Sequence, residues 1–428
     1  MNPIETIYSH YIKAYMVSTD SRKIEPNAVF FALKGENFDA NDFAMQVAKE
    51  GIASLVVADR KDLPKHERIL IVEDDALKTL QDLAAFHRQQ MKATVLSITG
   101  TNGKTTTKEL VSAVLAKKYN IIHTMGNLNN HIGVPLTLLS IKPETEIAVV
   151  EMGANHPGEI DFLCKIADPD YGLITNIGKA HLEGFGSFEG VIKTKTELYR
   201  HIKSHGKAVF VNQGNPLLWE QSEGMERISY GKHCEAFCPV APGQCDPYLS
   251  VVWNKRNIQT HLVGSYNFEN VAAAIGVGQY FEVEDDKIVE ALESYTPTNS
   301  RSQVIETEKN RIIMDAYNAN PTSMRAALIN FANICGEQHL LILGDMRELG
   351  TASEEEHRNI LALMKELRFK DALLVGPNFC AYNDNPAWLT FDNVKDLCQY
   401  LESSPVSEKT ILVKGSNSIQ LGKVLPLL

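Results

Sequence analysis

The sequence predicts an α/β protein with three domains, and three observations support that fold class. The chain has 428 residues, enough for two to four domains at about 100–200 residues each. A hydrophobic content of 44% is sufficient to form cores. Short apolar runs alternate with helical patterns, as they do when helices cover parallel sheets. We expect boundaries near residues 84 and 298, which gives the regions 1–84, 85–298 and 299–428.

The first region has the pattern of a small α/β unit. Strands are expected at residues 28–33, 54–57 and 69–72, alternating with helices such as 43–50. A further helix over 77–90 leads toward the central region.

The two later regions have the same alternation on a larger scale. Strands are expected in the central region at residues 94–98, 147–150, 172–175 and 208–211. Because helical stretches separate them, we predict parallel pairing and a doubly wound sheet. The third region predicts another layered α/β structure, with strands at 311–314, 339–343, 372–375 and 410–413.

Composition excludes several classes of protein. The 42 Lys and Arg against 53 Asp and Glu give a net charge of −11, which argues against a nucleic-acid partner. No apolar run approaches the roughly 18 residues of a membrane span, and the polar start of the chain is unlike a signal peptide. The seven cysteines fit reduced thiols better than a disulfide framework. We therefore expect a cytoplasmic protein with no membrane insertion.

The most informative segment is Gly100–Thr106 (GTNGKTT), which follows an apolar strand and precedes a helical pattern over 108–116. A glycine-rich turn before a helix N-terminus binds phosphate through its backbone amides. Lys104 would reach the β- and γ-phosphates of a nucleotide, and the Thr105 hydroxyl would contact Mg²⁺. The match to the general phosphate loop is partial, because Ile98 stands where that pattern has glycine. An ordinary strand-turn-helix junction is the alternative.

Two further polar residues follow predicted strands of the central region. Glu151 ends one strand and is a candidate Mg²⁺ ligand, although a solvated or helix-capping acid is the alternative. His181 follows another strand end and should face the same crevice, although a lone histidine is more often structural. Gly184, Gly186 and Gly190 miss the dinucleotide fingerprint by one residue and follow no strand directly, which excludes a Rossmann cofactor there.

These residues belong to a set of motifs that resembles the Mur ligases of peptidoglycan synthesis. The motifs occur in one order through all three regions: GTNGKTT, T-x-GNLNNxIGVP (124–135), EMGANHPGEI (151–160), HLEGFGS (181–187), GSYNFENVAAA (264–274), D-x-YNANP (315–321), GDMRELG (344–350) and VKGS (413–416). Within the family, the chain is most similar to the branch that adds D-alanyl-D-alanine to UDP-N-acetylmuramoyl-tripeptide.

The resemblance implies a three-domain, ATP-dependent amide ligase and a monomer. An N-terminal domain would bind the UDP-linked substrate, a central phosphate-loop domain would bind ATP, and a Rossmann-like C-terminal domain would close over the nucleotide. The γ-phosphate would pass to the peptide carboxylate, and the incoming amine would displace phosphate from the acyl phosphate to give UDP-N-acetylmuramoyl-pentapeptide.

The resemblance also implies roles for individual residues. The expected ATP contacts are Gly100, Thr101, Asn102, Gly103, Lys104, Thr105, Thr106, Asn267, Asn270, Arg301 and Asp315. The expected ligands of two Mg²⁺ ions are Thr105, Glu151, His181 and Lys195, with Lys195 carrying a CO₂-derived carbamate. The expected catalytic residues are Lys104, Lys195 and His181, and the expected UDP-substrate contacts are Ser21, Arg22, Asn127 and Asn130.

Several of these roles have a purely structural alternative. Lys195 and its neighbour Lys193 could be an exposed pair on a helix, and Asn267 could be a helix cap. Ser21 with Arg22, and the asparagines of GNLNN, could instead form capped turns.

The chain departs from the family pattern at two positions, and functions besides D-alanyl-D-alanine addition stay open. Ala316 replaces a serine and Asn417 replaces an arginine. The sibling that adds diaminopimelate as third residue has a D-N-P-R run, whereas Asp384–Ala387 lacks the arginine and is interpreted as a coincidental turn. The DSR run (20–22) argues against a folate polyglutamate ligase, a class that lacks it. The alternative of a non-ligating ATP-binding partner of another Mur enzyme is weakened by the presence of Lys104, Glu151, His181 and Lys195 together.

Overall fold

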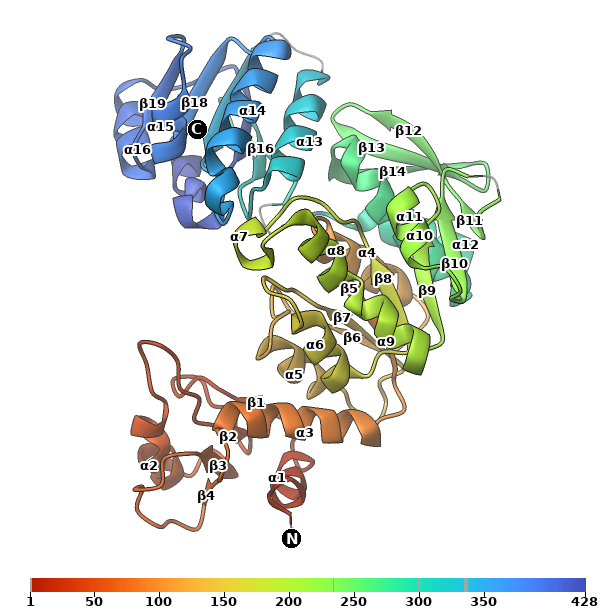
Figure 1. Cartoon of the computed structure of the whole chain (residues 1–428), viewed down its shortest axis with the longest axis vertical. Coiled ribbons are helices and arrows are strands. Elements are labelled where there is room, and N and C mark those ends of the chain that lie inside the picture. The colour runs from red at the N-terminus through yellow and green to blue at the C-terminus, as the bar shows by residue number, and fades with distance from the viewer. Residues whose placement is uncertain (1, 234, 299–300, 335–337) are drawn as a thin grey trace.

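The computed structural model describes residues 2–233, 235–298, 301–334 and 338–428. Three α/β bodies follow one another along the long axis of the molecule, with the N-terminal body at one end and the C-terminal body at the other (Figure 1). The predicted three-domain α/β architecture is therefore confirmed. No helix within these ranges is long and apolar enough to cross a membrane.

The N-terminal body is a four-stranded parallel sheet in the order β1-β2-β3-β4. Its elements are α1 (Pro3–Tyr11), β1 (Val17–Ser18), β2 (Val29–Phe31), α2 (Asn41–Glu50), β3 (Leu55–Ala58), β4 (Ile69–Ile71) and α3 (Ala76–Gln90). Phe30 packs toward α2, and its neighbour Phe31 packs toward α1 and α3, because successive side chains of a strand point to opposite faces. Helix α3 also contacts α5 and α6, so it joins this body to the next.

The central body is a seven-stranded parallel sheet in the order β11-β10-β9-β8-β5-β7-β6, which confirms the doubly wound prediction. Its first half contains β5 (Thr94–Thr99), α4 (Lys104–Leu115), β6 (Ile121–His123), α5 (Gly133–Leu138), β7 (Ile147–Glu151), α6 (Glu159–Ala167) and β8 (Tyr171–Ile174). Its second half contains α7 (Leu182–Phe185), α8 (Phe188–Lys195), α9 (Glu197–His205), β9 (Ala208–Asn212), α10 (Pro216–Gln221), β10 (Arg227–Gly231), β11 (Cys238–Pro239), α11 (Phe268–Tyr280) and α12 (Asp285–Ser294). Helices α4 and α11 cover one face, and α6 and α9 cover the other.

An antiparallel sheet of three strands, which we did not predict, lies beside this body. It consists of β12 (Ala241–Cys245), β13 (Tyr248–Trp253) and β14 (Arg256–Val263), and the short 3-10 helix η1 (Ser265–Asn267) leads from it into α11. Ile258, Thr260 and Leu262 are buried, while Gln259 and His261 between them are exposed. This alternation marks a half-exposed strand, and a search for continuous apolar runs does not find it.

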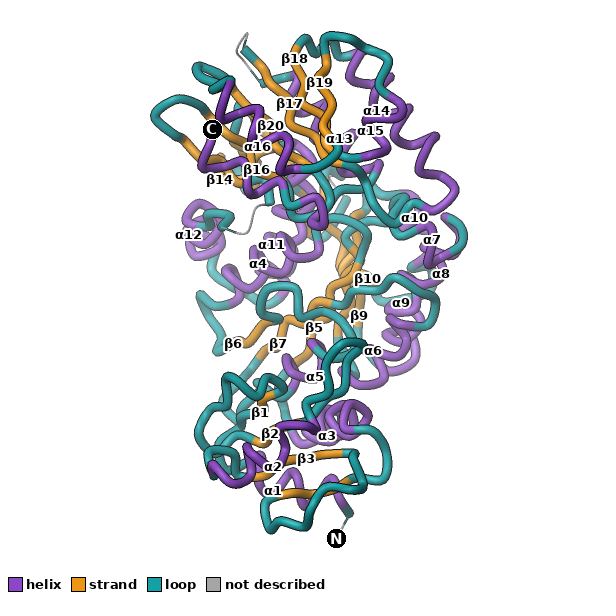
Figure 2. The backbone as a smooth tube through the Cα atoms, turned by 90° about the vertical axis from the view of Figure 1, so that its left-hand side faces the viewer, coloured by secondary structure: helices purple, strands orange, loops and turns teal. Residues whose placement is uncertain are grey.

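The C-terminal body is a six-stranded sheet in the order β15-β16-β20-β17-β18-β19, parallel except for β15. Its elements are β15 (Gln303–Glu306), β16 (Arg311–Asp315), α13 (Pro321–Ala332), β17 (His339–Gly344), η2 (Gly350–Ala352), α14 (Ser353–Glu366), β18 (Asp371–Val375), α15 (Pro377–Tyr382), β19 (Trp388–Phe391), α16 (Val394–Ser403), β20 (Thr410–Lys414), η3 (Asn417–Ile419) and η4 (Leu421–Leu427). Helices α13 to α15 cover one face, and α16 with η4 covers the other. Figure 2 shows the body from the side, with its strands stacked between these helices.

The predicted strands are present, with ends that differ by about two residues at most. One helix start was predicted wrongly: α4 begins at Lys104, not at Lys108. Gly103 adopts a left-handed conformation and ends the loop, so the next residue already belongs to the helix.

Candidate active site between the central and C-terminal domains

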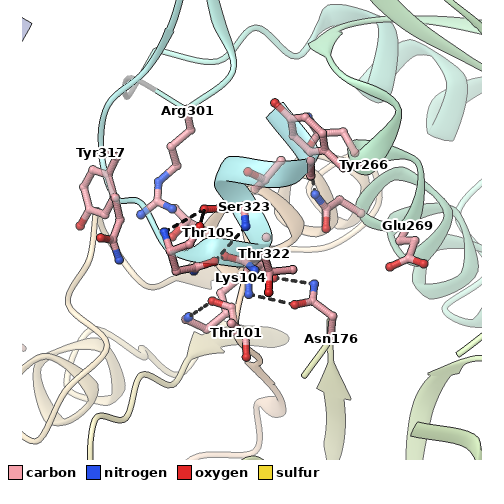
Figure 3. A pocket seen from close by; sticks show the side chains of 18 of the residues that line it. Thr101, Lys104, Thr105, Asn176, Tyr266, Glu269, Arg301, Tyr317, Thr322 and Ser323 are labelled. Carbon is pink, nitrogen blue, oxygen red and sulfur yellow. Dashed lines mark hydrogen bonds between the residues drawn. The ribbon is translucent and has the colours of Figure 1, made fainter. Parts of the chain in front are cut away.

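A cavity of about 900 Å³ lies where the carboxyl ends of two sheets face each other. One wall is formed by residues at the carboxyl ends of β5, β6, β7 and β8 or in the segments after them. The other is formed in the same way by residues at β16 and β20. Open α/β sheets bind their ligands at this edge. Figure 3 shows side chains from both walls pointing into the same space.

The glycine-rich loop is shaped by two close approaches. A Cβ on Gly100 would lie 2.0 Å from the Thr175 hydroxyl, and one on Gly103 would lie 2.4 Å from the Asn270 amide oxygen. Both glycines also have positive φ, of 143° and 78°. Only glycine fits here, and the turn directs the free amides of the first turn of α4 toward the cavity.

Lys104, the first residue of α4, bonds back to this loop through its side chain. Its Nζ donates to the carbonyls of Gly100 at 2.8 Å and Thr101 at 3.1 Å. The pKa of Lys104 is lowered to about 8, mainly by burial; Glu151 opposes the shift and nearby Arg301 adds to it. Two cations from different domains therefore share this space, as an anion site requires.

Glu151 has one satisfied and one unsatisfied oxygen. Its Oε1 accepts from the Thr105 hydroxyl at 3.1 Å and from the Asn129 amide at 2.8 Å. Its Oε2 is buried and has no hydrogen-bond partner among the described residues. An unpaired buried carboxylate oxygen is costly, so the site fits a cation that would arrive with the nucleotide. Because Glu151 is buried and bonds to side chains, the alternative of a solvated or helix-capping acid is wrong.

His181 lines the cavity, as predicted. It is the residue before α7, with a left-handed backbone (φ 51°), and its ring lies edge-on to Phe185 at 6.3 Å between centroids. The carboxylate of Glu348, from the C-terminal domain, contacts Nδ1 of His181 and this contact lowers the pKa of Glu348.

Lys195 lies behind the cavity wall. It is 2% exposed, its Nζ donates to the Ala154 carbonyl at 3.4 Å, and Ala154 lines the cavity. Burial, with a contribution from Lys104, lowers the pKa of Lys195 well below its usual value. Lys193 is exposed, so the alternative of an exposed lysine pair is wrong for Lys195.

Among the described residues, no three His, Cys, Asp or Glu side chains form a ready metal cluster. The predicted metal set contains only two such residues, Glu151 and His181. It depends on the Thr105 hydroxyl and on a modification of Lys195 for its other ligands.

The two asparagines of the GSYNFEN motif form a chain of hydrogen bonds beside the loop. Asn270 accepts from Thr107 at 3.0 Å and donates to Asn267 at 2.8 Å, and Asn267 donates to the Val263 carbonyl at 2.8 Å. The side chain of Asn267 does not cap α11, so that alternative is wrong. Both asparagines line the cavity.

The C-terminal domain contributes Arg301 and Asp315 to the opposite wall. The Arg301 guanidinium lies 3.7 Å from the centroid of the Tyr317 ring, a cation–π contact, and its buried Nε has no hydrogen-bond partner among the described residues. Asp315 accepts from Lys414 at 2.6 Å and from the backbone amide of Ser302 at 3.3 Å.

The predicted substrate-binding residues divide into two groups. Asn127 and Asn130 line the cavity, and Asn130 also accepts from the backbone amides of Ile132 and Gly133, as a capped turn does. Ser21 and Arg22 lie in the N-terminal body and do not line the cavity, and Arg22 is paired with Asp20.

Asn176 and Asn320 were missed at the sequence level, although Asn176 closely follows β8 and Asn320 stands in the D-x-YNANP motif. Asn176 accepts from the backbone amide of Asn102 and donates to its carbonyl, both at 3.0 Å. Asn320 reaches across from the start of α13 and donates to the Asn102 side chain at 2.7 Å. Residues far apart in sequence thus hold one loop residue, and no local pattern indicates that.

The departures from the family pattern lie outside the cavity. Ala316 packs against the core beneath α16, and Asn417 is exposed at the start of η3. Asp384–Ala387 forms a turn between α15 and β19, in which Asn385 accepts from the backbone amide of Ala387 at 3.1 Å. The interpretation of this run as a coincidental turn is therefore supported.

The chain matches known proteins along nearly its whole length. Residues 13–97 match the catalytic domain of the Mur ligase family, 98–278 match the Mur ligase middle domain, and 300–417 match the Mur ligase glutamate ligase domain. The UDP-N-acetylmuramoyl-tripeptide–D-alanyl-D-alanine ligase of Escherichia coli is 34% identical over 421 residues, which cover 96% of this chain and 92% of that protein.

Solved structures agree with this match. The crystal structure of MurF from Acinetobacter baumannii is similar with a TM-score of 0.85 at 31% identity, covering 96% of this chain and 92% of that one. The structure of MurF ligase from Thermotoga maritima in complex with ADP gives a TM-score of 0.83 at 27% identity, covering 96% of both chains. The chain belongs to the Mur ligase family, as its motifs predicted.

Proposed function

We propose that the chain is an ATP-dependent ligase that joins D-alanyl-D-alanine to UDP-N-acetylmuramoyl-tripeptide. The observation that supports this most strongly is the cavity in which the GTNGKTT loop, Glu151 and Arg301 meet between two domains. Full-length relatives that carry out this reaction by name share about a third of the sequence. We assign residues 1–84 to the UDP substrate, 85–298 to ATP and 299–428 to closure over the nucleotide.

ATP would lie across the loop with its phosphates on the first turn of α4. Residues 100–106 supply backbone amides and the Lys104 ammonium, and Arg301 approaches from the other domain. The cavity is also lined by Asn267, Asn270 and Asp315, which would contact the nucleoside.

Up to two Mg²⁺ ions would be held by Thr105, Glu151, His181 and a carbamate on Lys195. They would offset the negative charges of the ATP γ-phosphate and the peptide carboxylate, which must meet for the transfer. Carbamate formation needs a neutral amine, since the lone pair of Nζ attacks CO₂ and the nitrogen then loses a proton. Burial of Lys195 lowers its pKa, which favours that neutral amine.

The chemistry assigned to the chain's own residues is positioning and charge stabilisation. Lys104 and Arg301 would balance the charge of the transferring γ-phosphoryl group, and the exclusion of water between the domains would protect the acyl phosphate. The amine of D-alanyl-D-alanine would then form the amide bond as phosphate leaves.

The N-terminal body would hold the UDP end of the acceptor, with Ser21 and Arg22 as contacts, while Asn127 and Asn130 would meet the sugar-peptide near the cavity. A sibling activity that adds the third residue is less well supported, because Asp384–Ala387 lies outside the cavity and lacks an arginine. A monomeric state and a cytoplasmic location stay predictions.

The test is a ligation panel with UDP-dipeptide and UDP-tripeptide acceptors, each offered free amino acids or D-alanyl-D-alanine. We expect ADP release and a UDP-pentapeptide mass only with the tripeptide and D-alanyl-D-alanine together. Product from the dipeptide would favour the sibling activity, and ADP release without any amide product would contradict a ligase.

A further inference from the structure

The segment after β8 is contacted by the C-terminal domain at several points. Lys179 pairs with Glu356 at 2.8 Å, the Glu348 carboxylate contacts Nδ1 of His181, and the backbone amide of Glu183 donates to the Glu348 carbonyl at 3.5 Å. The domains therefore meet on both sides of His181.

The loop that carries Glu348 is braced within its own domain. Asp345 is fully buried and accepts from the backbone amides of Asn378 and Phe379, each at 3.0 Å. The backbone amide of Met346 donates to Nε2 of His357 at 3.1 Å, and that of Arg347 donates to the Ser416 hydroxyl at 3.0 Å. These contacts anchor residues 345–347, which directly precede Glu348.

The tip of this loop is shaped to reach the central domain. Glu348 has a left-handed backbone (φ 62°), and Gly350 follows with φ 55°. A Cβ on Gly350 would lie 3.4 Å from the Glu183 Cβ, so the backbones of the two domains are close there. Glu348 is thereby directed at one side of the His181 ring, while Phe185 lies beside the ring.

A carboxylate on one ring nitrogen fixes the orientation and tautomer of a histidine and leaves the lone pair of the other nitrogen available to a cation. We propose that Glu348 is a positioning residue, which orients His181 from the opposite domain and so couples domain docking to cation binding in the cavity. This inference rests on the proposed function, because it takes His181 as a ligand.

The test measures Mn²⁺ binding to the full chain with a non-hydrolysable ATP analogue, by the electron paramagnetic resonance signal of free Mn²⁺. Glu348→Gln keeps the shape of the side chain and removes its charge, and we expect it to raise the Mn²⁺ Kd about tenfold. Glu356→Gln weakens the interdomain pair with Lys179 but leaves the contact between Glu348 and His181 in place, and should change Kd less than about twofold. Glu354→Gln, on the exposed part of α14, is the surface control.

The outcomes separate this inference from the proposed function. If His181→Ala raises the Kd and Glu348→Gln does not, the positioning role is overturned and the ligand role stands. If His181→Ala has no effect, the ligand role of His181 itself is wrong. An equal loss in Glu356→Gln and Glu348→Gln would assign the effect to docking alone and would also overturn the proposal.

Discussion

The two walls of the cavity are built in different ways. The phosphate loop of the central wall is one continuous segment, in which Gly100 and Gly103 set the turn and α4 follows at once. The opposite wall gathers Arg301, Asp315 and Lys414 from separate parts of the C-terminal domain. The turn of the phosphate loop follows from the positive φ of its glycines, whereas the second wall depends on how one domain docks against another.

The largest effect is expected from substitution of Lys195, which lies behind the central wall. Lys195→Ala should lower ligation about 10³-fold, because the carbamate could no longer form. Binding of ATP, measured by calorimetry, should change little because Lys195 lies outside the cavity lining. Thermal melting checks that the buried substitution has not unfolded the chain, and normal turnover would remove Lys195 from the mechanism.

The next largest effect is expected from substitution of Lys104, whose contribution to ATP affinity depends on pH. Lys104→Ala should reduce phosphoryl transfer about 10²-fold. Because the pKa of Lys104 is lowered to about 8, the cation is present below that pH and is lost above it. ATP affinity measured between about pH 7 and about pH 9.5 should therefore fall as pH rises through the pKa of this lysine, and Lys104→Ala should flatten that profile. A profile unchanged by the substitution would contradict this role.

A smaller effect is expected where the two walls touch. Asn320→Ala removes the hydrogen bond to the Asn102 side chain and should raise the Kd of an ATP analogue about fivefold, equivalent to about 1 kcal/mol. Asn333→Ala, at the exposed end of α13, is the matched control. If the two variants bind alike, the interdomain contact does not shape the loop.

The smallest effect is expected in the turn between α15 and β19. Ala387→Arg restores the D-N-P-R pattern, yet the turn lies outside the cavity, so the acceptor panel should give the same products as the unaltered chain. New activity with diaminopimelate would show that this turn reaches the substrate.

Sequence reasoning predicted the strands well because buried parallel strands are continuous apolar runs. It missed the antiparallel sheet of β12 to β14 and the strands β1, β6, β10, β11, β15 and β19, and it started α4 four residues late because the apolar spacing begins only beyond Lys104. The loop, Glu151 and His181 were found because each lies at or after the carboxyl end of a predicted strand. Asn176, Asn320 and Glu348 were not, since their partners lie in other segments.

The family, the order of the three domains and the phosphate loop could all be read from the chain alone, because glycine geometry and strand ends are local properties. Three other features emerged from the packed molecule: Lys195 is buried while Lys193 is exposed, Asn267 bonds to Val263 instead of capping a helix, and Glu348 meets His181. These features depend on packing between segments distant in the chain, and no local periodicity encodes them.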